Sequence, residues 1–211
     1  METKSPGVLL QSIPYLGKKQ ILKVFTLEDG LVTLMAKSVH SPFCIGEWVY
    51  RKKQGDIYTL QEGSLIDPLL ELRANYERLS AAGAIAKDLL RSQLPTKKNS
   101  DLYALLTTYL KKLPLFADPA ILVASFRLKL LLHEGLLSLQ EMCCNCGGPA
   151  QHLFQGESYC LEHTSALGHS FSPTEWRELL LLSFARQFSL LQNSESAPKE
   201  KIERIFEERL H

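Results

Sequence analysis

The chain has 211 residues, of which 45% are hydrophobic and 22% are charged, and its formal net charge is +1. This length accommodates one large domain or two small ones, each with a buried core. The longest apolar run, from Ile121 to Leu132, is interrupted by Arg127 and Lys129, and the sequence does not open with a signal-peptide pattern. We therefore expect a cytoplasmic globular protein without a membrane span.

The first part of the chain has the pattern of short strands separated by turn signals. Five strands in about 65 residues predict a small closed or nearly closed β-barrel, for which the OB-fold is the commonest arrangement and an SH3-like barrel fits almost as well. We expect this barrel to form a domain over residues 1–65. The expected strands are Gly7 to Ile13, Gln20 to Leu27, Leu31 to Ser38, Cys44 to Arg51 and Ile57 to Glu62.

The predicted barrel carries a local excess of positive charge. Between Tyr15 and Asp56 the sequence has seven basic residues and four acidic ones. A polyanion would bind such a surface by phosphate neutralisation, with an affinity that depends on salt. An ordinary solvated surface accounts for these numbers equally well. The basic residues are Lys18, Lys19, Lys23, Lys37, Arg51, Lys52 and Lys53.

From Asp67 onward the period of the apolar residues changes from two to 3.6, which predicts a helical domain over residues 66–211. One or two amphipathic helices are expected over residues 72–90, and another over residues 102–110. Three acidic or hydroxyl residues precede a proline and therefore resemble N-caps, and the last of them also begins a capping box: Asp67, Asp118 and Ser172. Further expected elements are an apolar central helix from Pro119 to Leu137, a helix from Pro173 to about Gln192, a linker from Ser194 to Pro198 and a charged helix from Lys199 to Leu210.

A cluster of cysteine and histidine residues lies within the helical part. Cys143 and Cys146 form one x2 pair, and Cys160 and His163 form a second pair after a loop. This spacing is typical of a zinc knuckle, so we expect one structural Zn²⁺ per chain. Four protein ligands leave no position for an activated water, which argues against a catalytic metal.

Other interpretations of the cluster remain open. The thiols can be reduced side chains that pack as small hydrophobic groups. Cys144 can replace Cys143 as a ligand, and His152 or His169 can replace His163. The motifs of a zinc deaminase, a nucleophile elbow and a P-loop are missing from the sequence, so we expect a protein that is not an enzyme.

The order of these parts resembles the RecO family of bacterial DNA repair and recombination mediators. The resemblance covers roughly Gly7 to Leu182 and rests on the expected barrel, the segment from Phe126 to Leu131 followed by Gly135, and the Cys-x2-Cys-Gly knuckle. The segment from Tyr15 to Gly17 and the turn near Gly30 also resemble the family's first hairpin. Family members that bind zinc commonly end the knuckle with a pair of cysteines, whereas this chain has His163 in the last place.

The resemblance implies a two-domain α+β protein, with an OB-like barrel and a helical domain that contains a zinc-knuckle insertion. It implies binding to single- and double-stranded DNA, strand annealing, contact with RecR and with the acidic tail of single-strand-binding protein, and loading of RecA in association with the nucleoid. On this interpretation the seven basic residues contact phosphates, and Trp48, Tyr50 and Tyr58 are candidates to stack bases. The alternative is that these rings fill the barrel core, which we favour for Trp48 and leave open for Tyr50 and Tyr58. The candidates for the tail site are Phe126, Arg127 and Lys129.

Two alternatives to this interpretation remain open. Arg127 and Lys129 can instead extend their charged ends to the surface or pair with Glu134. The chain as a whole can be a zinc-stabilised module for protein interaction or transcription that has no annealing activity.

Overall fold

The computed structural model describes residues 2–37, 40–192, 194 and 196–210. The chain forms two compact units, Met1–Leu115 and Phe116–His211. The boundary expected near residue 65 falls at the end of the barrel, whereas the units divide after two further helices. Ser38 of the third expected strand and Glu195 of the expected linker lie outside the described residues.

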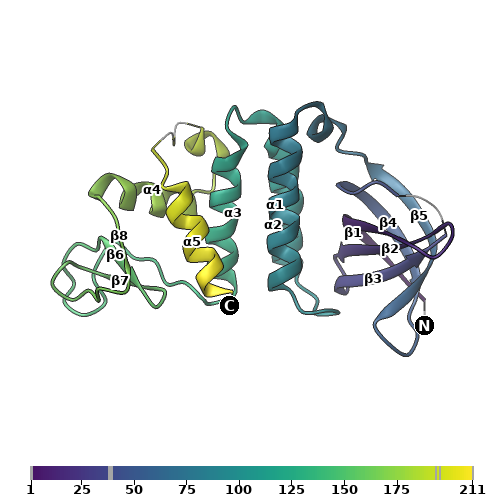
Figure 1. The fold of residues 1–211 in the computed structure, drawn as a ribbon, viewed down its shortest axis with the longest axis horizontal. Coiled ribbons are helices and arrows are strands. Elements are labelled where there is room, and N and C mark those ends of the chain that lie inside the picture. Colours follow the sequence, from purple (N-terminus) through teal and green to yellow (C-terminus); the bar gives the residue numbers. More distant parts are fainter. Residues whose placement is uncertain (1, 38–39, 193, 195, 211) are drawn as a thin grey trace. The chain divides into compact units, whose positions relative to one another are not determined.

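The first unit begins with a closed barrel whose strands follow the order β1-β2-β3-β5-β4 (Figure 1). β3 and β5 run parallel, and the other neighbouring strands run antiparallel. This is the connectivity of the OB-fold, so the prediction of a five-stranded OB-like barrel is confirmed. The strands are β1 (Glu2–Tyr15), β2 (Lys19–Thr26), β3 (Gly30–Ala36), β4 (Cys44–Arg51) and β5 (Ile57–Asp67).

The barrel interior is filled by alternate residues of each strand, because successive side chains of a strand point to opposite faces. The core cluster contains Leu9, Leu22, Leu34, Trp48 and Tyr50, all of which are buried. The indole of Trp48 donates a hydrogen bond from Nε1 to the carbonyl of Gly7 at 3.0 Å. The core interpretation of Trp48 therefore agrees with its position.

Two helices and two short 3₁₀ turns complete the first unit: η1 (Leu70–Ala74), α1 (Tyr76–Ser92), α2 (Ser100–Lys112) and η2 (Leu113–Leu115). Asn75 and Asn99 cap the two α-helices by accepting hydrogen bonds from backbone N–H groups. Asp67 was expected to start a helix, but its carboxylate instead accepts a hydrogen bond from the backbone N–H of Leu69 in a turn. Leu69 has a φ of 46°, so the chain cannot continue there as a right-handed helix.

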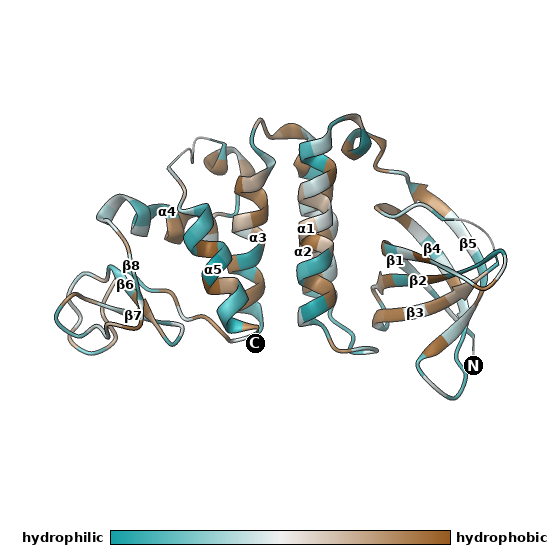
Figure 2. Ribbon diagram, viewed as in Figure 1, coloured by the Kyte–Doolittle hydropathy of each residue, from teal (hydrophilic) through white to brown (hydrophobic). Residues whose placement is uncertain are grey.

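The second unit contains a buried central helix, α3 (Pro119–His133), which packs against α4 (Pro173–Phe184) and α5 (Lys199–Arg209). Figure 2 shows both hydrophilic and hydrophobic stretches on α5. α3 ends four residues before the expected Leu137, because Gly135 adopts a φ of 71° and turns the chain. α4 begins with the expected capping box of Ser172 and Glu175 but ends at Phe184, and the short turn η3 (Phe188–Leu191) follows.

The segment between α3 and α4 forms the expected insertion. Its strands are β6 (His152–Phe154), β7 (Glu157–Tyr159) and β8 (His169–Ser170), in the order β7-β6-β8. The first ligand pair, Cys143 and Cys146, precedes β6, and the second, Cys160 and His163, lies between β7 and β8. Across the described residues, no helix is both long and apolar enough to span a bilayer.

Candidate functional site

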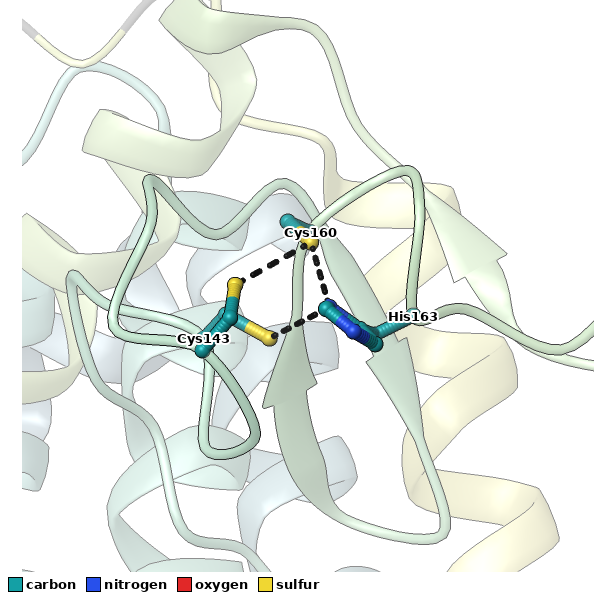
Figure 3. A group of neighbouring side chains, drawn as sticks. Cys143, Cys160 and His163 are labelled. Atoms are coloured by element: carbon teal, nitrogen blue, oxygen red, sulfur yellow. Dashed lines mark hydrogen bonds between the residues drawn. The ribbon is translucent and has the colours of Figure 1, made fainter.

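Three thiol sulfurs and one imidazole nitrogen converge in the insertion of the second unit. Cys143 and Cys146 lie in the loop before β6, while Cys160 and His163 follow β7. Their ligand atoms all lie within 4.8 Å of one another. Figure 3 shows the side chains of Cys143, Cys160 and His163 pointing toward one another. The predicted ligand set is therefore brought together by the fold.

The spacing of these atoms fits a tetrahedral ion. The sulfurs of Cys146 and Cys160 are 3.7 Å apart, and Nδ1 of His163 lies 3.9 Å from Cys143 Sγ and 3.2 Å from Cys160 Sγ. Zinc–sulfur bonds of about 2.3 Å in a tetrahedron place two sulfurs about 3.8 Å apart. Three thiols and one imidazole are also donors that zinc prefers. The cluster can therefore hold a metal ion.

The backbone around the first pair is folded in a way that presents both sulfurs to one point. The N–H of Cys143 donates to the carbonyl of Gly148 at 2.7 Å, and the N–H of Gly147 donates to the carbonyl of Cys143 at 3.0 Å. Gly147 has a φ of 72°, which glycine adopts without steric cost. The N–H of Gly148 donates to Cys146 Sγ at 3.4 Å, which lowers the pKa of this thiol, but burial and the neighbouring thiols of Cys160 and Cys143 raise its pKa overall.

The electrostatics of the cluster favour ionised sulfur at Cys143. Burial opposes ionisation, but backbone N–H groups of Cys160, Asn145 and Cys146 outweigh it and lower the pKa of the Cys143 thiol to about 6. The hydrogen bond with Cys160 raises the pKa of His163, so a proton competes with a metal ion for this imidazole in acid.

The alternative ligands lie elsewhere. Cys144 is exposed, and its sulfur contacts Asn145 while its backbone N–H donates to the carbonyl of Ser158. Both ring nitrogens of His152 are engaged, with Ser170 Oγ at 2.9 Å and the carbonyl of Ser165 at 3.0 Å. His169 Nε2 lies 2.8 Å from a carboxylate oxygen of Glu208. The geometry therefore favours the Cys143 and His163 register.

The register of the barrel identifies the residues on its outer face, because residues paired across strands point to the same side. One row across the sheet runs from Ile13 on β1 to Ile21 on β2, Met35 on β3 and Thr59 on β5. A neighbouring row contains Gln11, Lys23, Thr33 and Ile57. Ile13 is 39% exposed and Ile57 is 44% exposed, so apolar side chains meet solvent on this face.

The adjacent part of the outer surface of β2 and β3 is covered. Phe25 and Leu31 also point outward by register but are buried. The segment after α1 pairs with β3 there, since Thr96 donates from its N–H to the carbonyl of Leu31 at 2.9 Å. The rows of Ile13 and Lys23 therefore form the uncovered part of the outer surface of β2 and β3, and we call it the open barrel face.

The predicted basic residues divide between the two ends of this face. Lys18 and Lys19 lie at the β1–β2 turn and are exposed, as is Lys37, which follows β3. Gln20 pairs with Ala36, so Lys19 and Lys37 lie at the same end of the neighbouring strands. Lys23 lies between the ends and donates from Nζ to Thr33 Oγ1 at 2.9 Å.

At the other end, the basic residues are partly committed to contacts within the barrel. Lys52 Nζ lies 2.7 Å from Asp29 Oδ1, and Arg51 lies 3.9 Å from a carboxylate oxygen of Glu2. Lys53 is exposed in the β4–β5 turn. The Lys52 contact is shielded, because its partner Asp29 has only 16% of its side chain exposed. Lys52 therefore has a structural role whatever else it contacts.

The two tyrosines expected to stack bases face inward. The ring of Tyr50 is fully buried and lies parallel to that of Tyr58, with centroids 6.1 Å apart. The hydroxyl of Tyr50 donates to Asp29 Oδ2 at 2.5 Å. Burial, followed by this hydrogen bond, raises the pKa of Tyr50. Tyr50 offers no ring face to a base, and Tyr58 packs against the same core cluster.

The apolar residues of the open barrel face were missed by the sequence reasoning. Ile13, Ile21, Met35 and Ile57 alternate with core residues, and a hydrophobic residue at an outward position looks the same in sequence as one at an inward position. The pairing of Ile21 with Met35 identifies the outward set. Tyr15, which pairs with Lys19 and is 44% exposed, is an aromatic residue at the edge of this face.

The three residues expected to form a partner site in the second unit are largely engaged within it. Phe126 is fully buried. Arg127 Nη2 lies 3.2 Å from Glu203 Oε1, and its guanidinium lies 5.5 Å from the centre of the Phe206 ring. Lys129 donates from Nζ to the carbonyl of Ala185 at 2.7 Å, and burial lowers its pKa. These contacts join α3 to α5 and to the end of α4.

A groove of about 580 Å³ lies beside the end of α4. Its lining includes Leu139, Arg177, Leu181 and the exposed ring of Phe184, and it reaches Ala185, the residue that accepts the hydrogen bond from Lys129. Glu141 also lines this groove, so it combines apolar surface with one cationic and one anionic side chain.

Comparison with known proteins agrees with the fold. Residues 1–69 match the family described as Recombination protein O N terminal, and residues 73–208 match Recombination protein O C terminal. The chain belongs to the RecO family. The two RecO matches meet near residue 70, where the barrel ends and η1 begins.

Several RecO proteins are similar over most of the chain. The DNA repair protein RecO of Chlamydia pneumoniae is 29% identical over 213 residues, which cover 95% of this chain and 84% of that protein. The protein of the same description from Chlamydia trachomatis serovar D is 27% identical, with 90% and 84% covered. The one from Bacillus subtilis is 26% identical, with 69% and 61% covered.

Proposed function

We propose that this chain is a DNA repair and recombination mediator of the RecO type that handles single- and double-stranded DNA without catalysing covalent chemistry. The names of its relatives support a role in DNA repair. The open barrel face carries the proposal of DNA binding, because it joins exposed apolar side chains to lysines in one place.

The placement of this face suits a nucleic acid strand. OB-folds bind oligonucleotides over strands 2 and 3 and the loops β1–β2 and β4–β5. In this chain those loops carry Lys18 and Lys53, while Lys19 and Lys23 lie on the second strand. Lysines at the rim meet phosphates, and the apolar centre with Tyr15 contacts bases without selecting a sequence.

The finer steps of the proposed function come from the family resemblance. The chain anneals complementary strands, acts with RecR and helps to load RecA onto gapped DNA coated with single-strand-binding protein, in the cytoplasm at the nucleoid. The groove beside Phe184 supports contact with an acidic, aromatic protein tail, since Arg177 lines it and Lys129 is anchored at its end.

Zinc has a structural role in this proposal. One Zn²⁺ held by Cys143, Cys146, Cys160 and His163 would fix the two loops around the small sheet. Bound ions of this kind supply folding free energy to small insertions that lack a large core. The residues proposed to contact DNA belong to the barrel, so removal of the ion and removal of basic side chains have separable effects.

Binding to labelled DNA at several salt concentrations tests the proposal. We expect binding to both single and double strands that weakens steeply as salt increases, because phosphate contacts release counterions. The alternative function, a zinc-stabilised interaction module, predicts no salt-dependent retention of DNA. An absence of DNA binding at low salt by the folded, metal-loaded chain would favour that alternative.

A further inference from the structure

A pocket of about 470 Å³ opens at one end of the barrel, between the β3–β4 loop, the end of β5 and η1. All of its lining residues belong to the first unit. Its volume falls in the range of about 300–1,000 Å³ in which small-molecule sites are found. It lies apart from the open barrel face, because the core residue Trp48 lines it from inside the barrel.

Two glycines bring the indole of Trp48 to this pocket. A Cβ atom on Gly46 would lie 3.2 Å from the six-membered ring, and a Cβ atom on Gly63 would lie 3.1 Å from it. Side chains at these positions would therefore crowd the ring, from β4 itself at Gly46 and from the neighbouring β5 at Gly63. The Nε1 hydrogen bond to Gly7 fixes the indole in place. Trp48 is only 2% exposed, so a small, rigidly held part of its indole reaches the floor of the pocket.

A second aromatic ring forms a wall. His40 packs edge-on against Trp48, with ring centroids 5.6 Å apart and planes at 64°. Burial lowers the pKa of His40, so the imidazole is neutral at pH 7 and presents a π surface. Leu65 and Leu70 form apolar lips, and each is 63% exposed. Flat aromatic ligands match a site with this lining.

A cation lies at the rim. Arg73 donates from Nη1 to the carbonyl of Pro68 at 3.0 Å and from Nη2 to the carbonyl of Pro42 at 2.7 Å. Both acceptors are neutral, so they position the guanidinium without cancelling its charge. The backbone N–H of His40 donates to Gln20 Oε1, which places the pocket at the same end of the barrel as the β1–β2 turn with Lys18 and Lys19.

We propose that this pocket takes one unstacked nucleobase of a single strand, with Arg73 facing the attached phosphate. The inference rests on the proposed DNA-binding function and adds a defined base site to it. A strand is favoured over an aromatic peptide because several cations lie at this end of the barrel. A strand supplies a phosphate to each of them, whereas a peptide terminus supplies one carboxylate.

The fluorescence of Trp48 tests the proposal directly. The chain has two tryptophans, so Trp176→Phe leaves Trp48 as the single reporter. We would titrate this variant with a twelve-residue oligothymidylate and with an abasic strand of equal length and charge. The expected result is saturable quenching by the oligothymidylate and no quenching by the abasic strand, while both strands bind in an anisotropy assay.

A pair of matched variants places the quenching in the pocket. Leu70→Glu adds a negative charge at its lip, and Leu94→Glu makes the same change at an exposed leucine of the same unit that does not line it. We expect at least tenfold weaker quenching affinity for Leu70→Glu and a change below twofold for Leu94→Glu. Leu65→Glu provides a second lip variant if Leu70→Glu fails to fold.

Three outcomes would overturn the base site. These are equal quenching by the abasic strand, equal effects of the Leu70 and Leu94 variants, and quenching by an aromatic peptide with none by oligothymidylate. If Trp176→Phe does not fold, the unmodified chain can be titrated with a strand that contains a single 2-aminopurine. The fluorescence of this base changes when it leaves the stack of the strand, and Leu70→Glu should suppress that change. Loss of all DNA binding would instead refute the proposed function.

Discussion

Replacement of Lys19 and Lys37 by glutamine is expected to weaken DNA binding through the loss of two phosphate contacts. Both side chains are exposed and lie at the same end of β2 and β3. Each contact with a single strand contributes about 0.7 to the slope of log affinity against log salt, so the slope should become shallower by about 1.4. At 0.15 M salt the affinity for a single strand should fall roughly fourfold for each lost contact and about fifteenfold for the pair.

Fluorescence anisotropy of a labelled thirty-residue strand, measured between 50 and 300 mM salt, provides both numbers. The matched control is Lys87→Gln with Lys97→Gln, which removes the same charge from exposed positions of the same unit. The control should retain the slope of the unmodified chain. An unchanged slope in the Lys19 and Lys37 variant, or an equal change in the control, would refute the assignment of the open barrel face.

Three further predictions concern stability and metal. Purified protein should contain one zinc per chain. Cys146→Ser should lose the zinc and lower the melting temperature by more than about 5 °C, whereas Cys144→Ser should keep it. An absence of zinc from both the unmodified chain and Cys144→Ser would show that the cluster is empty. Tyr50→Phe should reduce the free energy of unfolding in urea by about 1–2 kcal/mol through loss of the hydrogen bond to Asp29, whereas Tyr15→Phe should change it by less than about 0.5 kcal/mol. The hydrogen bond from Lys201 lowers the pKa of Glu175 below its ordinary 4.5, so the charged carboxylate stabilises the fold above pH 4.5 and this contribution is lost as the pH falls through the lowered pKa. Glu175→Gln should therefore reduce the free energy of unfolding by about 0.5 kcal/mol at pH 7 and leave it unchanged once the Glu175 carboxyl is protonated in the folded chain. A difference in denaturation midpoint that does not depend on pH would contradict an electrostatic origin of this effect.

Local sequence patterns predicted the elements well where a short-range signal existed. The capping box of Ser172 and the ligand spacing from Cys143 to His163 involve residues close in sequence, and both are present in the structure. The five strands were also placed well, although β1 and β5 extend beyond the expected ends. Asp67 failed as a helix start, because Leu69 adopts a left-handed conformation that its residue type does not reveal.

The details of the barrel surface depend on register and could not be predicted from periodicity. Pairing between strands distant in sequence places the Asp29 carboxylate beside Tyr50 and Lys52. Lys52, a candidate phosphate ligand, and Tyr50, a candidate stacking ring, are therefore part of the barrel structure. Arg127 likewise looked like a surface cation but contacts Glu203 and Phe206 on a helix some 75 residues later in the sequence. Such pairs leave no local signal.

The lysine contact at Asp29 also affects how DNA binding should be tested. Charge reversal of Lys52 and Lys53 together would place a carboxylate beside Asp29 and disturb the barrel. A loss of binding in that variant would therefore be ambiguous. Lys53→Gln alone, with Lys52 retained, is the cleaner variant at the β4–β5 turn.

Annealing of complementary strands coated with single-strand-binding protein tests the central claim most directly. The account predicts that the unmodified chain accelerates annealing, that the Lys19 and Lys37 variant is slower, and that acceleration decreases when the acidic tail of the coating protein is removed. Annealing at the uncatalysed rate in the presence of the folded, zinc-loaded chain would contradict the account.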